Sequence, residues 1–328
     1  MGTVPTAIVA LVLTLVLVPP VLWVLRRQQI LDLPNERSSH DQPTARGGGL
    51  AVVIGCSVAL LLGTDIGGPA RAGVLFVAVA MGVIGLVDDV RGLPPLTRLA
   101  AQILVAGASL PWLGAAFHGP VLFGGAAVVL WLVAYVNAFN FMDGINGLSV
   151  AQVVVAGVAW WAIGEQQHVG PLAAGGLVVA AGGVAFLPFN LGRAPALFLG
   201  DVGSYFLGGW LAAVAVLGLR SGLAPEAVLA PLAVYAADTA TTFVWRLRRH
   251  QAWYQAHRDH AYQRLVQQGW AHTRTSALVA ATMIACAALG TLSLTGSLLA
   301  RAFGDVMIGG VVAAYLLSPT IVKRRSLG

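Results

Sequence analysis

The chain has 328 residues, of which 58% are hydrophobic and only 10% are charged. Soluble domains carry roughly 25% charged residues, so this composition excludes an ordinary soluble protein and indicates a polytopic membrane protein. The net charge of +6 does not indicate nucleic-acid binding, because basic residues of membrane proteins mainly mark cytoplasmic loops.

The apolar runs predict an all-α transmembrane helix bundle that forms one domain over residues 1–328. With about 17–25 apolar residues per crossing, we expect about eleven spans, at 4–25, 48–63, 71–87, 99–115, 121–138, 148–163, 169–187, 202–219, 226–244, 275–296 and 303–322. The first run is followed, not preceded, by Arg26 and Arg27, which favours a retained span over a cleaved signal peptide.

The distribution of basic residues predicts the orientation. With the N-terminus outside, 16 of the 19 Lys and Arg lie on the cytoplasmic side, and only Arg71, Arg220 and Arg301 lie outside. We therefore expect an outside N-terminus and a cytoplasmic C-terminus in the cytoplasmic (inner) membrane. The polar motifs then fall in the cytoplasmic loops 26–47, 88–98, 137–147, 188–201 and 245–274.

The first cytoplasmic loop ends in the sequence PTARGGG, before the second span. Exposed backbone N–H groups in a glycine run, next to a cation, suit a phosphate group. This makes Arg46 and Gly48 candidate substrate contacts. The alternative is a plain glycine turn beside a solvated arginine.

The third span closes with Asp88 and Asp89 in GLVDDVRG. Adjacent carboxylates repel each other unless a cation or a proton shares the site. Mg²⁺ is the natural cation, since it binds carboxylates together with substrate phosphates. One Asp with a raised pKa could instead act as a general base. If the pair has no function, it is simply a solvated helix end beside Arg91 and Arg98.

The stretch NAFNFMDGINGL, residues 137–148, follows an apolar run. Asn137, Asn140 and Asp143 are spaced by three, so a continuing helix would place them on one face. Gly144 and Gly147 would let the backbone approach a ligand closely. A carboxylate next to a membrane span costs free energy, so such a residue indicates a function. The alternative is an ordinary polar helix end.

The next motif, FLGDVGS, places Asp201 at the start of the eighth span, with Asn190 upstream. An Asp at this position can simply cap the helix. In the longest loop, His257, Arg258 and His260 cluster in HRDHAYQRL. Arg and His suit diphosphate oxygens, whereas a basic helix on anionic lipid is the alternative.

Asp238 lies in the inner half of the ninth span. It either supports this polar cluster or makes a hydrogen bond to a threonine of its own helix. Zinc is not expected in the long loop, because no cysteine is near and arginines crowd it.

Together, carboxylates from three loops with Arg, His and glycine-rich backbone describe a metal-dependent phosphate site, and its chemistry is phosphoryl transfer. A transporter or lipid flippase is the alternative, but it requires polar residues near the bilayer midplane and on both sides. A non-catalytic scaffold would leave the clustered motifs unexplained.

In these motifs the sequence resembles the polyprenyl-phosphate N-acetylhexosamine-1-phosphate transferases, which form glycosyltransferase family 4. The resemblance runs from Asp32 to about Trp270 and rests on PTARGGG, GLVDD, NAFNFMDGINGL, FLGDVGS and HRDHAYQRL, in family order. It implies a cytoplasmic site that depends on Mg²⁺, with Mn²⁺ as an alternative. It also implies transfer of an N-acetylhexosamine 1-phosphate from a UDP-sugar to a polyprenyl (undecaprenyl) phosphate, which releases UMP and starts a lipid-linked envelope glycan.

The resemblance also implies roles for single residues. Asp201 matches the family's metal-binding Asp, and Asn140 matches a polar ligand at or beside that ion. Asp88 and Asp89 match an aspartate pair, one member of which would deprotonate the lipid phosphate.

Asp143 and Asn146 match positions that line the nucleotide pocket, and His257 and His260 match histidines that contact the diphosphate. Further substrate contacts are expected from five other residues of these loops, namely Arg46, Gly48, Asn137, Asn190 and Arg258. The expected partners are the two substrates and membrane lipids, with no nucleic acid, and a homodimer is left open.

Two features depart from the family pattern. Asn146 stands where the family usually has the second Asp of DGxDG, so nucleotide contacts can differ. The loop lacks the HHH run of the peptidoglycan enzyme, which argues against a muramoyl-pentapeptide donor. HRDHAYQ is closer to members that transfer deoxy N-acetylhexosamines for O-antigens, which implies a place in lipopolysaccharide or cell-wall biogenesis.

Overall fold

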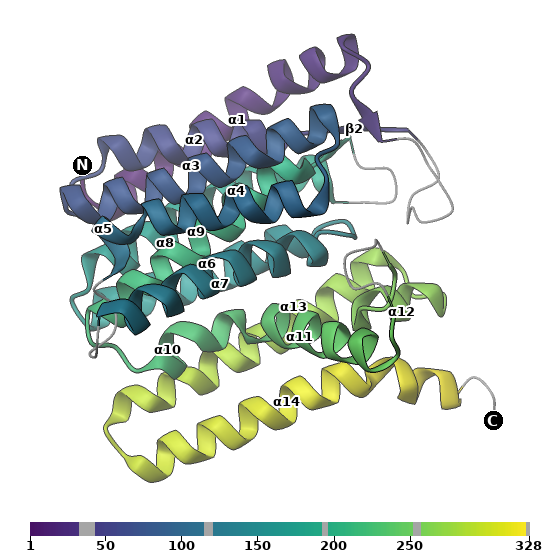
Figure 1. Cartoon of the computed structure of the whole chain (residues 1–328). Helices are drawn as coiled ribbons and strands as arrows, with labels where there is room; N and C mark the ends of the chain where they lie inside the picture. The colour runs from purple at the N-terminus through teal and green to yellow at the C-terminus, as the bar shows by residue number, and fades with distance from the viewer. Residues whose placement is uncertain (33–42, 115–120, 192–195, 252–256, 326–328) are drawn as a thin grey trace.

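The computed structural model describes residues 1–32, 43–114, 121–191, 196–251 and 257–325. This part of the chain is almost entirely helical, as the composition predicts (Figure 1). The helices are α1 (Thr3–Arg27), α2 (Gly49–Leu62), α3 (Gly68–Arg91), α4 (Pro95–Ala108), α5 (Leu110–Leu113), α6 (Val121–Met142), α7 (Leu148–Gln166), α8 (Gly170–Asn190), α9 (Gly200–Arg220), α10 (Pro225–Leu229), α11 (Ala233–Arg248), α12 (Ala261–Gln267), α13 (His272–Gly290) and α14 (Leu298–Arg325), with the 3₁₀ turns η2 (Ala230–Leu232) and η3 (Thr291–Thr295).

Within the described residues, 9 helical segments are long and apolar enough to cross a membrane. Two of them combine α-helix and 3₁₀ turn, over Pro225–Arg248 and His272–Thr295. The other two expected spans, 48–63 and 99–115, correspond to α2 and α4, which have 14 residues each. At 1.5 Å per residue such a helix rises about 21 Å, which is less than the ~30 Å hydrocarbon core. The number of crossings therefore stays a prediction.

The described parts of the five loops that carry the sequence motifs all lie at one end of the bundle. This end, at the right of Figure 1, bears β2, α12 and the C-terminus, whereas the N-terminus lies at the opposite end. We call it the polar end. The arrangement follows from helices that alternate in direction, so that every second connection returns to the same side.

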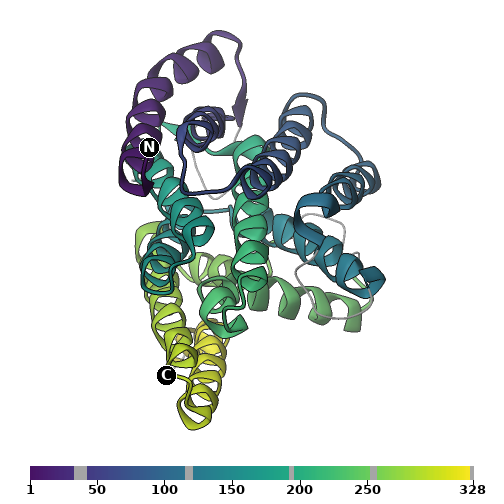
Figure 2. The same ribbon diagram turned by 90° about the vertical axis from the view of Figure 1, so that its left-hand side faces the viewer.

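Helix α9 occupies the middle of the bundle, between α3, α6 and α8 (Figure 2). Its neighbours approach closely at glycine residues, where a larger side chain would be crowded. A Cβ on Gly85 of α3 would lie 2.1 Å from the carbonyl oxygen of Asp201, and one on Gly208 would lie 3.0 Å from Val136 of α6. Small residues at helix contacts are how membrane helices gain packing energy, and here they bring α3 against the first turn of α9.

A small sheet at the polar end was not expected from the sequence. It contains β1 (Leu31–Asp32), β2 (Thr44–Arg46) and β3 (Leu197–Phe198), in that order. β2 pairs antiparallel with β1 and parallel with β3, with Arg46 opposite Phe198. The sheet fastens the first loop to the segment before α9, which brings Arg46 to the start of that helix.

Candidate functional site

A carboxylate at the end of α3 forms hydrogen bonds with the start of α9. Asp89 accepts the backbone N–H of Asp201 (3.0 Å) and of Val202 (2.9 Å) with its two carboxylate oxygens. These are N–H groups that a helix start leaves without an intrahelical partner. Asp89 therefore caps α9, and Asp201 itself makes no capping hydrogen bond, so the simple capping interpretation of Asp201 is wrong.

Arg46 bridges the two carboxylates. Its Nε lies 2.8 Å from Asp89 Oδ1 and its Nη2 lies 2.8 Å from Asp201 Oδ2. The remaining oxygen of Asp201 accepts a hydrogen bond from Asn140 Nδ2 at 2.9 Å, and the same nitrogen lies 2.9 Å from the Ser204 hydroxyl. We call Arg46, Asp89, Asn140 and Asp201 the carboxylate cluster.

Burial and charge differ within the carboxylate cluster. The Asp201 side chain is 17% exposed and that of Asp89 only 3%, so Asp201 is the carboxylate that a ligand can reach. Burial lowers the pKa of Arg46, but Asp201 and Asp89 outweigh it and hold that pKa above its ordinary value. The guanidinium thus stays charged beside both carboxylates.

Asp88 takes part in a separate interaction. Its Oδ1 accepts the backbone N–H of Leu93 at 2.8 Å, and its Oδ2 lies 2.7 Å from Nη1 of Arg98. Successive residues of a helix point about 100° apart, so Asp88 and Asp89 have different partners. A cation shared by the adjacent pair stays a prediction, whereas a solvated helix end does not describe Asp88, whose side chain is only 5% exposed.

The N–H groups of the glycine run form hydrogen bonds within the protein and are not exposed as expected. The N–H of Gly48 donates to the carbonyl of Phe198 (2.9 Å), and that of Gly49 donates to the carbonyl of Leu199 (2.8 Å). A Cβ on Gly48 would lie 2.2 Å from Leu197. These N–H groups are not available to a phosphate in this structure, so the reason for naming Gly48 as a substrate contact is wrong. The run is needed for close packing.

The polar residues of NAFNFMDGINGL contact three different helices, and α6 ends at Met142, before Asp143. Asn137 donates to Gln102 of α4 at 2.6 Å, whereas Asn140 contacts α9. Asp143 accepts a hydrogen bond from Ser149 of α7 at 2.5 Å. The expectation of one shared helix face is therefore wrong. Asn137 lies in the contact between α4 and α6, and the other two residues line the polar end.

Asp143 interacts electrostatically with both the carboxylate cluster and the long loop. Burial raises the pKa of Asp143 to about 7, the hydrogen bond from Ser149 lowers it, and the nearby charge of Asp201 raises it further. Burial also raises the pKa of Tyr262, with contributions from Asp238 and Asp143. Asp143 is thus within electrostatic range of both the carboxylate cluster and the long loop.

Asn146 and Asn190 are buried. Asn190 accepts the N–H of Gly147 (2.8 Å) and donates to the carbonyl of Leu197 (3.2 Å). Its side chain therefore joins the ends of α7 and α8 to β3. This is a supporting role, and substrate contact by Asn190 and Asn146 stays a prediction. Arg193, which the sequence places nearby, lies outside the described residues.

The histidines of the long loop pack around a buried carboxylate. His260 Nδ1 lies 3.1 Å from Asp238 Oδ1, and both side chains are almost inaccessible. The ring centroids of His257 and His260 lie 5.0 Å apart. Burial, followed by the charges of His260 and Arg246, lowers the pKa of His257 to about 4, so His257 is neutral at pH 7. Asp238 supports this cluster and also accepts a hydrogen bond from Thr242 at 3.3 Å, so both expectations for it are confirmed.

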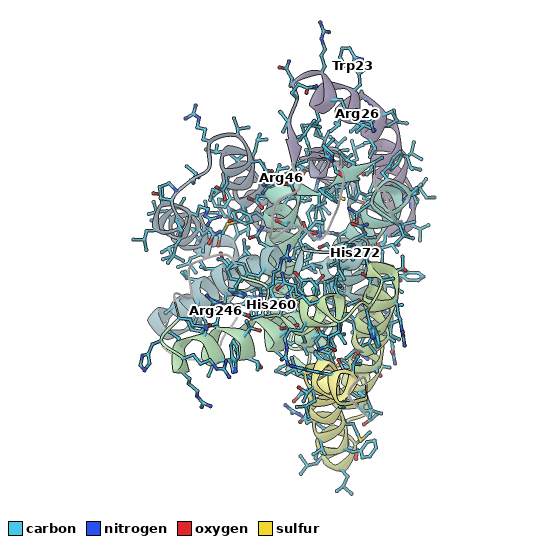
Figure 3. All side chains as sticks on the ribbon, turned by 90° about the vertical axis from the view of Figure 1, so that its right-hand side faces the viewer. Trp23, Arg26, Arg46, Arg246, His260 and His272 are labelled. Carbon is cyan, nitrogen blue, oxygen red and sulfur yellow. The ribbon has the colours of Figure 1, made fainter. Side chains whose placement is uncertain are left out.

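The long loop is fastened to NAFNFMDGINGL by Tyr262. Its hydroxyl donates to the carbonyl of Phe141 at 3.0 Å. A Cβ on Gly144 would lie 2.2 Å from that hydroxyl, so Gly144 is needed for this approach. Figure 3 looks onto the polar end, where Arg46 and His260 lie near the middle and Trp23 lies at the rim. The motif residues from distant parts of the chain therefore meet on one face.

The donor atoms fit Mg²⁺ bound in part by a substrate. No group of three or more His, Cys, Asp or Glu within the described residues could hold a metal ion alone. Mg²⁺ is usually held by one or two carboxylates plus substrate phosphates, not by an all-protein cage. Asp201 and the amide oxygen of Asn140 are hard oxygen donors of this kind, although in this structure the amide nitrogen of Asn140 faces Asp201.

Comparison with known proteins adds a family-level similarity. Residues 71–219 match the family described as Glycosyl transferase family 4. The match contains Asp88, Asp89, Asn140, Asp143 and Asp201. It ends before the histidine loop.

Three relatives extend the similarity over most of the chain. The chain is 32% identical to the decaprenyl-phosphate N-acetylglucosaminephosphotransferase of Mycolicibacterium smegmatis, over 75% of this chain and 71% of that protein. It is 30% identical to the protein of the same name from Mycobacterium tuberculosis, over 96% of this chain and 88% of the relative. It is also 30% identical to the phospho-N-acetylmuramoyl-pentapeptide-transferase of Streptococcus suis, over 64% of this chain and 71% of that protein.

Proposed function

The chain belongs to glycosyl transferase family 4, the polyprenyl-phosphate N-acetylhexosamine-1-phosphate transferases, and we propose that it transfers an N-acetylhexosamine 1-phosphate from a UDP-sugar to a polyprenyl phosphate. The names of its relatives support the acceptor and the kind of sugar. The observation that carries the proposal is the carboxylate cluster, in which Asp201 is reachable and is flanked by Arg46 and Asn140.

In the proposed reaction, an oxygen of the polyprenyl phosphate attacks the phosphorus that carries the sugar. The bond from that phosphorus to the oxygen bridging toward UMP breaks, and the electron pair leaves with UMP. Positioning and charge neutralisation supply most of the catalysis in phosphoryl transfer. The two substrates carry several negative charges, so the site must supply positive charge.

Asp201 and Asn140 would hold Mg²⁺, whose chemistry is to neutralise the diphosphate of the donor. Arg46 adds a permanent positive charge 2.8 Å from Asp201 Oδ2. Arginine suits phosphate because its planar guanidinium can donate two parallel hydrogen bonds. We therefore assign Arg46 to a phosphate of either substrate.

The acceptor needs little help in losing a proton, because the second pKa of a phosphate monoester is about 6. All four carboxylate oxygens of Asp88 and Asp89 already accept hydrogen bonds. We therefore propose positioning roles for this pair instead of proton removal. Asp89 holds Arg46 and the start of α9, and Asp88 holds Arg98.

The donor would lie between NAFNFMDGINGL and the histidine loop. Asp143 and Asn146 are assigned to the uridine part, and Arg258, His257 and His260 to the diphosphate. Because His257 is neutral at pH 7, it would contribute a hydrogen bond and not a charge. The positive charge on this side of the donor would come from Arg258.

We place the polar end at the cytoplasmic face of the membrane, where UDP-sugars are made. Three Arg–Trp pairs at this end support a position at the membrane interface, where Trp side chains gather. In these pairs the guanidinium carbon lies 5.2 Å, 3.9 Å or 3.8 Å from the ring centroid, for Arg27 with Trp23, Arg249 with Trp245 and Arg274 with Trp270.

The test uses membranes that contain the protein, incubated with Mg²⁺, polyprenyl phosphate and one UDP-N-acetyl sugar at a time. The expected result is a lipid-linked sugar diphosphate with an equal amount of UMP, for at least one donor. Solute or lipid movement across the membrane without either product would support the transporter or flippase alternative instead. Asp305→Asn, which changes an exposed carboxylate of α14 outside the polar end, is the matched control.

A further inference from the structure

Both carboxylate oxygens of Asp201 face nitrogen donors. Oδ1 accepts a hydrogen bond from Asn140 Nδ2 at 2.9 Å, and Oδ2 lies 2.8 Å from Nη2 of Arg46. An ionised carboxylate can only accept hydrogen bonds, so the nitrogen of the Asn140 amide, and not its oxygen, faces Asp201. The same nitrogen lies 2.9 Å from the Ser204 hydroxyl. In this conformation Asn140 therefore does not offer a metal ion its amide oxygen next to Asp201.

The guanidinium of Arg46 competes with any other cation for Asp201. Arginine stays protonated in proteins, so Arg46 brings a permanent positive charge. A carboxylate offers about four lone-pair sites, so Arg46 does not block Asp201 by its size. The obstacle is charge, because a divalent cation on Asp201 would lie next to the guanidinium, and like charges at short range repel strongly in a partly buried site.

The structure leaves the end of the Arg46 side chain free to move while its other contacts are fixed. Its backbone belongs to β2, where its N–H donates to the carbonyl of Ile30 at 3.2 Å. Its Nε lies 2.8 Å from Oδ1 of Asp89, whose side chain is 3% exposed, whereas that of Arg46 is 37% exposed. Asp89 is itself held by the N–H groups of Asp201 and Val202. Nη2 can therefore leave Asp201 while Nε stays on Asp89.

A diphosphate is the ligand that would draw Nη2 away from Asp201. Phosphate oxygens accept two parallel hydrogen bonds from a guanidinium and carry more charge than one carboxylate. The ionised carboxylates of Asp89 and Asp201 exceed Arg46 by one negative charge. Mg²⁺ alone would leave an excess of positive charge in the carboxylate cluster, and a diphosphate would balance it. The cluster therefore favours the two ligands together over Mg²⁺ alone.

We propose that Arg46 is an internal counter-ion of Asp201 that makes the binding of Mg²⁺ and of the donor diphosphate cooperative. In the free protein, Arg46 competes with Mg²⁺ for Asp201. When the donor binds, Nη2 moves to a phosphate oxygen, and the amide of Asn140 turns its oxygen toward the metal. This inference rests on the proposed function, which supplies the donor and the metal. Coupling between two ligands typically changes affinity 5–150-fold and is reciprocal.

Mn²⁺ binding to the purified protein, followed by electron paramagnetic resonance without and with UDP, tests the proposal. UDP carries the diphosphate whatever the sugar of the donor is. In the wild type we expect UDP to tighten Mn²⁺ binding by about 5–150-fold, after correction for the Mn²⁺ that UDP binds by itself. Arg46→Gln removes the competing charge. Without UDP, this variant should bind Mn²⁺ at least about 5-fold more tightly than the wild type, and UDP should add less. Equal or weaker binding would overturn the proposal.

Arg98→Gln is the matched control for the loss of a positive charge. Arg98 also lies within electrostatic range of Asp201, but its Nη1 contacts Asp88 at 2.7 Å. We therefore expect a clearly smaller gain in Mn²⁺ affinity from Arg98→Gln than from Arg46→Gln. Equal gains in the two variants would show only the long-range effect of a charge, and would overturn the direct competition at Asp201.

A second measurement follows Arg46 itself and does not require Arg46→Gln to fold. With ¹⁵N-labelled arginine, the difference between the spectra of the wild type and Arg46→Lys identifies the side-chain signals of Arg46. We expect these signals to change when Mg²⁺ and UDP are added together, and to stay in place with the same concentration of Mg²⁺ alone. No change with both ligands, or an equal change with Mg²⁺ alone, would overturn the proposal.

The two proposals can fail separately. If Mn²⁺ and UDP bind cooperatively through Arg46 but no lipid-linked product forms with any donor, the proposed function fails and the coupling does not. If product forms but Arg46→Gln gains no affinity for Mn²⁺, the coupling fails and the proposed function stands.

Discussion

Arg46 Nη2 lies 2.8 Å from Asp201 Oδ2, and this ion pair joins the first loop to the first turn of the central helix. The pair exists because Arg46 follows Ala45 in β2, whose neighbour β3 leads directly into α9. Asn140 donates to the other oxygen of Asp201 at 2.9 Å. The most accessible carboxylate of the cluster is therefore held in place by two side chains from different parts of the chain.

The first prediction concerns the charge of Asp201. Asp201→Asn keeps the size of the side chain and removes its negative charge. Because metal-assisted charge stabilisation is worth several kcal/mol and 1.36 kcal/mol is tenfold in rate, we expect product formation to fall by at least about 100-fold. Mn²⁺ binding, followed by electron paramagnetic resonance, should be lost in the same variant. Asp305→Asn should keep both, and an Asp201→Asn protein with normal rate and Mn²⁺ binding would contradict the role of Asp201.

A second prediction tests the positioning role of Asp89. Asp89→Asn leaves one acceptor oxygen for the two N–H groups of Asp201 and Val202, and it places an NH₂ group beside Arg46. A buried donor without a partner costs about 1–3 kcal/mol, so the thermal midpoint in detergent should fall, and activity with it. An Asp89→Asn protein as stable as the wild type that has nevertheless lost all activity would favour proton removal by Asp89.

The third prediction concerns pH. Burial lowers the pKa of His257 to about 4, so its protonated form exists only at lower pH and is absent between pH 6 and pH 8. His257→Gln should therefore change the rate by a similar factor across this range and leave the shape of the kcat profile as it is. If the variant instead removes a titration step near pH 6.5, His257 has its ordinary pKa of roughly 6.5 and the buried, neutral assignment is wrong.

The fourth prediction uses a pair of glycines. Gly144→Ala would place a Cβ 2.2 Å from the Tyr262 hydroxyl and would break its hydrogen bond to Phe141. Because this bond fastens the histidine loop to NAFNFMDGINGL, we expect a loss of activity and faster proteolysis of the long loop. Gly310→Ala is the control, since a Cβ there meets nothing within 4 Å, and it should match the wild type in both measurements.

Much of the site could be predicted from the sequence, because its residues lie in short polar motifs that interrupt apolar runs. Asp201, Asn140 and Arg46 all stand in such motifs, and they meet in the structure. Their pairing could not be predicted, because it depends on strands of two or three residues. Such strands are too short to show an alternating pattern.

The same limit applies to the partners of single side chains. The sequence does not show that Asp88 contacts Arg98 whereas Asp89 contacts the start of α9, because helix geometry turns the two side chains toward different neighbours. Tyr315 gives no signal at all, since it is one aromatic residue in an apolar helix that lies 77 residues from its partner Asp238. Contacts between distant helices depend on packing, which local sequence does not encode.

The most direct test of the account follows the two phosphates of the donor. Purified protein is incubated with Mg²⁺, polyprenyl phosphate and a UDP-N-acetylhexosamine that carries a radioactive label in the phosphate attached to the sugar. We expect this label in the lipid product, and we expect the other phosphate to leave as UMP. Release of labelled UDP, or transfer of the sugar without its phosphate, would contradict the proposed reaction.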